Sequence, residues 1–68
     1  MWKNVQRIMN DRNMTVYRLA RETKINENTL YSYSRGVSEP SFKNMCKVAD
    51  ALNVSLDKFR EDQHGERY

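Results

Sequence analysis

Residues 15–36 read TVYRLARETKINENTLYSYSRG and predict two short helices, 16–23 and 27–34, joined by a tight turn. Thr15 and Asn26 stand directly before these helices, where their side chains can accept hydrogen bonds from backbone N–H groups of the first turn. The second helix carries a nearly unbroken row of small polar side chains on one face. Because such a face suits the edges of base pairs better than bulk water, the stretch indicates a small DNA-binding protein.

Apolar residues at helical spacing predict three further helices and no strands in the rest of the chain. We expect these helices over 2–13, 42–52 and 56–59, with Ser41 and Ser55 capping the last two. Helices this short are unstable alone, so their apolar faces must pack together. The expected core residues are Val5, Ile8, Leu19, Ala20, Thr23, Ile25, Leu30, Tyr33, Phe42, Met45, Val48, Ala49, Leu52 and Val54.

The chain has 68 residues, which is enough for one domain with a single core. Residues 1–60 are expected to form a helix-turn-helix domain, and the polar tail 61–68 is expected to fray. Trp2 is expected to be a lid over the first and last helices, whereas an exposed Trp2 would mark a protein interface.

The net charge of +3 is unevenly distributed along the chain. Residues 1–36 hold seven basic and three acidic side chains, which gives +4, and residues 37–68 hold five and six, which gives −1. The positive charge therefore lies with the two-helix unit, where a polyanion would bind. The sequence has no membrane-spanning run and no secretory signal. The lone Cys46 is expected to be a buried thiol in a reducing compartment. We therefore expect a cytoplasmic protein.

The sequence argues against an enzyme. Its only histidine is His64 in the tail, and no nucleophile and base pair or glycine-rich phosphate loop is evident. Asp50 and Asp57 are too far from other ligand types to indicate a metal site. We therefore expect no catalytic residues, metal, cofactor or small-molecule ligand.

The pattern from Val5 to Phe59 resembles the phage-repressor-like helix-turn-helix family, the lambda repressor/Cro or XRE type. The resemblance rests on Thr15 with Leu19-Ala20, Ile25-Asn26 with Thr29-Leu30, Arg35-Gly36, Pro40-Ser41-Phe42 and Val48-Ala49-Asp50-Ala51-Leu52-Asn53-Val54-Ser55-Leu56. It implies an all-α, compact five-helix domain of bacterial or phage origin. In that family the third helix lies in the major groove and the start of the second helix meets the phosphate backbone.

The resemblance also implies roles for individual residues. The residues implied to contact bases are Asn26, Glu27, Asn28, Thr29 and Ser32, and those implied to contact phosphates are Thr15, Val16, Tyr17, Tyr31, Arg35, Lys43 and Asn44. A dimer surface is implied around Leu56 and Phe59. An amide such as that of Asn28 can bond adenine N6 and N7 together. Glu27 either accepts from cytosine N4 or complements the helix dipole, and Tyr31 either lies along the groove wall or packs on a neighbouring helix.

The sequence departs from the family pattern in three ways. Val16 stands where family members often carry Gln. Met9 and Ser34 replace both partners of a frequent Arg–Glu ion pair, so no charge is left stranded and the fold should form without it. Lys24 stands at the turn where Gly is common, and a positive φ there would be mildly strained or would shift the turn.

These features predict a transcriptional regulator, specifically a repressor that binds a pseudo-palindromic operator as a homodimer. Two copies on half-sites one helical turn apart supply the selectivity that one domain lacks. The alternative is an interaction module of the same fold with weak or no DNA binding, such as an antitoxin-like partner. Val16 and Glu27 favour this alternative.

Overall fold

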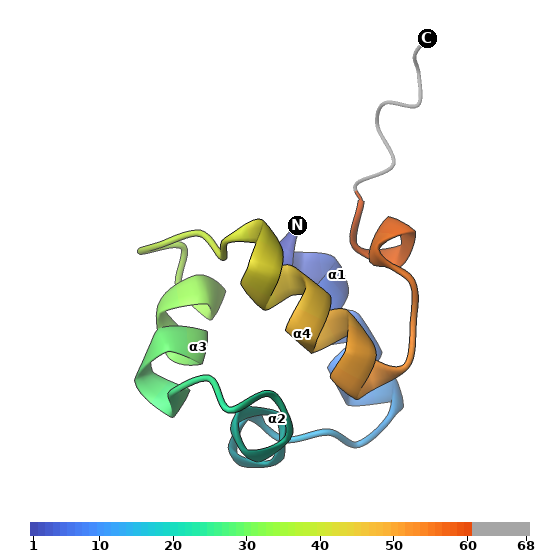
Figure 1. The fold of residues 1–68 in the computed structure, drawn as a ribbon, viewed down its shortest axis with the longest axis horizontal. Coiled ribbons are helices and arrows are strands. Elements are labelled where there is room, and N and C mark those ends of the chain that lie inside the picture. The colour runs from blue at the N-terminus through green and yellow to red at the C-terminus, as the bar shows by residue number, and fades with distance from the viewer. Residues whose placement is uncertain (61–68) are drawn as a thin grey trace, which may run out of the picture.

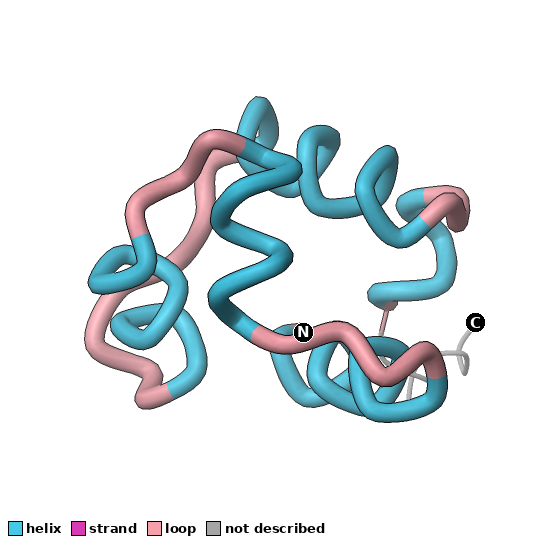
Figure 2. The backbone as a smooth tube through the Cα atoms, turned by 90° about the horizontal axis from the view of Figure 1, so that it is seen from below, coloured by secondary structure: helices cyan, strands magenta, loops and turns pink. Residues whose placement is uncertain are grey.

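The computed structural model describes residues 1–60, and within that range all regular structure is helical (Figure 1). Four α-helices, α1 (Trp2–Asp11), α2 (Val16–Thr23), α3 (Glu27–Ser34) and α4 (Phe42–Leu52), are followed by the 3-10 turn η1 (Leu56–Phe59). The predicted tail 61–68 lies outside the described residues. Figure 2 shows how short loops separate the helices.

Four of the five expected helices are α-helices, and the fifth is the single 3-10 turn η1. Ser55 makes no side-chain cap there, contrary to expectation. The side-chain amide of Asn4 donates to the carbonyl oxygens of Phe59 at 3.2 Å and Arg60 at 2.7 Å. These two bonds fix the end of the turn and the residue after it to α1. Helix α1 also ends at Asp11, two residues earlier than predicted.

Each α-helix is followed by a residue in the left-handed conformation: Asn13, Lys24, Gly36 and Asn53, with φ between 55° and 75°. After α3, the N–H of Gly36 donates to the Tyr33 carbonyl and that of Val37 to the Ser32 carbonyl, the pattern of a Schellman motif. Glycine and asparagine tolerate this conformation well. Lys24 does not, so the strain that the sequence predicted is present, and the turn keeps its expected position.

Replacement of Lys24 by Gly is expected to raise the free energy of unfolding by up to about 1 kcal/mol, because glycine adopts a φ of 62° without a Cβ clash. Lys24→Ala is the matched control, since it removes the same charge and keeps the Cβ. Urea unfolding of both variants measures the difference. A Gly variant no more stable than the Ala variant would mean that the turn carries no strain.

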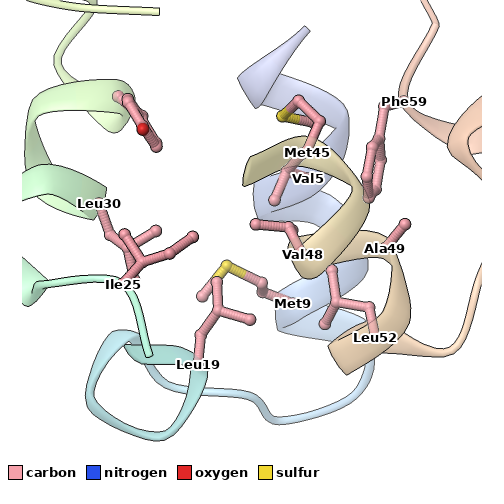
Figure 3. Packing of buried hydrophobic residues seen from close by; sticks show 11 residues of the cluster. Val5, Met9, Leu19, Ile25, Leu30, Met45, Val48, Ala49, Leu52 and Phe59 are labelled. Atoms are coloured by element: carbon pink, nitrogen blue, oxygen red, sulfur yellow. The ribbon is translucent and has the colours of Figure 1, made fainter. Parts of the chain in front are cut away.

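The core forms where the buried faces of α1, α2, α3, α4 and η1 come together (Figure 3). Leu30 and Ile25 enter it from one side, and Leu52, Ala49 and Phe59 from the other. The buried hydrophobic residues are Val5, Met9, Leu19, Ile25, Leu30, Tyr33, Met45, Val48, Ala49, Leu52 and Phe59.

Three burial expectations are corrected by the structure. Phe42 was expected in the core but is 74% exposed, because it begins α4 one turn before Met45 and overhangs the core edge. Cys46 is half-buried rather than buried. Trp2 is a half-buried lid over α3, a helix that it was not expected to cover, since its ring lies 5.3 Å from the Tyr33 ring at an interplanar angle of 59°.

Candidate nucleic-acid interface

Helix α3 lies at one edge of the molecule, with α2 packed against it (Figure 1). In that view α2 is seen end-on and α3 from the side, so the two helices cross steeply. The inner face of α3 is held by the buried Leu30 and Tyr33. Asn28, Ser32 and Arg35 are spaced i, i+4 and i+7, which places them together on the opposite, outer face.

The first turn of α3 carries most of the residues implied to contact bases. The Asn26 side chain caps the helix by accepting from the Asn28 N–H at 2.7 Å. The Asn28 side chain is exposed and makes no hydrogen bond within residues 1–60, so its amide is available to a base. Glu27, Thr29 and Ser32 are half-buried and present only part of their surface. On the outer face, Asn28 is therefore more exposed than Glu27, Thr29 and Ser32.

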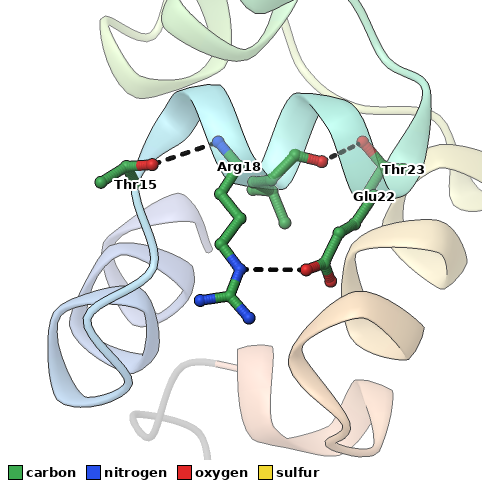
Figure 4. Close-up of polar contacts among 5 residues, drawn as sticks. Thr15, Arg18, Glu22 and Thr23 are labelled. Atoms are coloured by element: carbon green, nitrogen blue, oxygen red, sulfur yellow. Dashed lines mark hydrogen bonds and ion pairs between the residues drawn. The ribbon is translucent and has the colours of Figure 1, made fainter.

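Side-chain hydrogen bonds stabilise both ends of helix α2 (Figure 4). The Thr15 hydroxyl accepts from the Arg18 N–H at 3.1 Å, as the sequence predicted. The buried Thr23 hydroxyl donates to the Leu19 carbonyl at 2.7 Å and accepts from the Ile25 N–H at 3.2 Å. These bonds fix the turn between α2 and α3. Both helices of the unit therefore have a defined mutual orientation.

The residues implied to contact phosphates differ in what they offer. The Val16 side chain packs against the core, which leaves its backbone N–H as the group that can meet a phosphate. Tyr17 and Tyr31 are exposed. The Arg21 guanidinium lies 5.7 Å from the centroid of the Tyr17 ring, a cation–π arrangement.

The basic side chains near the interface are also unequal. Arg35 and Lys43 are exposed and make no ion pair within the described range. Arg18, in contrast, is paired with Glu22, its Nε lying 3.1 Å from the Glu22 carboxylate. Two cations, one after α3 and one in the first turn of α4, are therefore free to neutralise phosphates.

A model of the Cro/C1-type HTH DNA-binding domain matches residues 4–61. The chain belongs to this family. No curated protein and no solved structure matches it significantly. The α2–turn–α3 unit is the helix-turn-helix of this Cro/C1-type domain, and membership makes the chain a DNA-binding regulator.

The Cro/C1-type domain forms here without the frequent Arg–Glu pair. Met9 is buried in the core and the exposed Ser34 hydroxyl donates to the Tyr31 carbonyl of its own helix at 2.9 Å. Neither position leaves a charge stranded, as the sequence indicated.

The residues expected at a dimer surface are only partly accessible. Phe59 was expected at the surface, but it is 2% exposed and belongs to the core. It is buried because Asn4 holds η1 against α1. Leu56 is half-buried. Both line an apolar pocket of about 330 Å³, and the exposed Phe42 lines it as well.

The sequence missed one link between α3 and α4. The side-chain amide of Asn44 donates to the Tyr33 hydroxyl at 2.9 Å. Helical spacing identified Tyr33 as a core residue, but this spacing does not indicate which group its hydroxyl contacts.

Within residues 1–60 no metal-type cluster of His, Cys, Asp or Glu occurs, and no helix in that range is long and apolar enough to cross a membrane.

Proposed function

We propose that this protein is a sequence-specific repressor that binds a pseudo-palindromic operator in double-stranded DNA as a homodimer. The observation that carries the proposal is the open outer face of α3, with the unpartnered Asn28 amide at its centre, in a domain of a DNA-binding family. In this proposal Asn28 reads a base, Asn26, Glu27, Thr29 and Ser32 line the groove, and Arg35 and Lys43 hold phosphates.

A fluorescence titration with mixed-sequence duplex DNA at two salt concentrations tests DNA binding. If Arg35 and Lys43 of two copies each neutralise one phosphate, the affinity should fall about 100-fold for a fourfold rise in salt. The same titration with duplexes selected from a random pool tests sequence preference. No association at low salt would instead support an interaction module of this fold.

The dimer is proposed to form through the apolar pocket and the exposed Phe42 in its lining. An exposed aromatic side chain in the lining of an apolar pocket forms a self-complementary surface, so each copy can pack its Phe42 against the pocket of the other. Leu56 lies in the same pocket, which retains part of the expected dimer surface.

Phe42→Ser is expected to raise the dimer dissociation constant at least about 100-fold, because two phenylalanine side chains lose their burial, each worth about 1.5–3 kcal/mol. Val37→Ser is the matched control, since Val37 is 70% exposed and does not line the pocket. Sedimentation equilibrium measures both variants. An unchanged dissociation constant for the Phe42 variant would place the dimer surface elsewhere.

A further inference from the structure

Tyr33 differs from the rest of the core in carrying a hydroxyl to a neighbouring helix. Its side chain is 7% exposed, and its ring packs against Trp2. A phenylalanine would supply the same packing. The hydroxyl adds one interaction, the hydrogen bond from the Asn44 amide at 2.9 Å, which joins residues 11 positions apart.

Asn44 is held at two points. Its backbone N–H donates to the Ser41 hydroxyl at 3.1 Å, and its side-chain amide donates to Tyr33. The side chain is only half-buried. The amide therefore keeps a second N–H and a carbonyl oxygen beyond the bond to Tyr33.

The Tyr33–Asn44 bond joins α3 and α4 across an exposed connecting segment. Residues 35–39 are exposed, and Gly36 has a φ of 75°. In the described part of the chain, no other side-chain hydrogen bond joins α3 to a different helix. The two free cations of the interface, Arg35 and Lys43, lie on opposite sides of this segment. Their separation thus depends on how α4 is fixed to α3.

We propose that Tyr33 is a positioning residue for DNA binding: its hydroxyl holds Asn44 and thereby sets the first turn of α4, with Lys43, against the phosphate backbone while α3 reads the groove. The inference rests on the proposed function. Tyr33 itself stays on the inner side of α3 and does not touch DNA.

Tyr33→Phe is expected to weaken binding about two- to tenfold, the range for one lost hydrogen bond. The loss should be equal for selected and mixed duplexes, because phosphate contacts carry no sequence information. The salt slope should stay unchanged, because no charge is removed. In an Asn44→Ala background the same substitution should cause no further loss. Ser34→Ala is the matched control, since it removes a hydroxyl that bonds only within α3.

Two further measurements, together with DNA binding by the unmodified protein, separate positioning from stability and from the proposed function. Thermal unfolding should show Tyr33→Phe folded at the binding temperature. In NMR spectra of the unmodified protein, the Asn44 side-chain amide protons should exchange slowly, whatever the variant does. Fast exchange of the Asn44 amide protons would overturn the inference while DNA binding stands. So would an unchanged DNA affinity in Tyr33→Phe. The same holds if Tyr33→Phe lowers the affinity equally with and without Asn44→Ala. No DNA binding by the unmodified protein would overturn both.

Discussion

Leu30→Ala is expected to cost about 2–5 kcal/mol of the free energy of unfolding, the range for a buried leucine truncated to alanine. Leu30 is 1% exposed and is one of two buried residues on the inner face of α3. A domain of about 60 residues has roughly 3–9 kcal/mol in total. The substitution should therefore leave much of the protein unfolded near physiological temperature, measured by circular dichroism during thermal unfolding.

The control for Leu30→Ala is Val37→Ala, which truncates an exposed side chain and should change stability by less than about 0.5 kcal/mol. Selected DNA should raise the melting temperature of the Leu30 variant, since DNA binds the folded state alone. A melting temperature equal to that of the unmodified protein would show that α3 is not held through its inner face.

Asn28→Ala is expected to abolish preference at one base pair in each half-site. A bidentate amide–adenine pair is worth about 1–3 kcal/mol of discrimination, so the loss should be roughly 5- to 150-fold at that position. Affinity for mixed DNA should change little. Titration with duplexes substituted at each position in turn measures the effect. An unchanged preferred sequence would remove Asn28 from the reading role.

Arg35→Ala provides the contrasting result. It should weaken binding to every duplex and lower the magnitude of the salt slope by about 1.8 for a dimer, one phosphate contact being lost in each copy. Selectivity should survive. A loss confined to certain sequences would instead give Arg35 a direct contact with bases.

Much of the fold could be predicted from the sequence because its local signals agree. The first residues of α2, α3 and α4 follow from Thr15, Asn26 and Ser41, each of which caps its helix with a side-chain bond. Helical spacing correctly placed Leu19, Leu30 and other inward residues in the core.

The errors occur where spacing alone does not determine the environment. Phe42 shares its helical face with Met45, but the core ends before it, and periodicity does not show where a core ends. Phe59 was expected at a surface, yet the Asn4 amide, 55 residues earlier, holds η1 against α1. The Tyr33–Asn44 bond joins two different helices, and no local sequence pattern predicts it.

The central claim is that the outer face of α3 enters the major groove. NMR titration of the ¹⁵N-labelled protein with a selected duplex tests it residue by residue. The largest shifts are expected at residues 26–35, with further shifts at 15–17 and 43–44. Shifts concentrated around Leu56 and Arg60, with 27–34 unaffected, would contradict the claim.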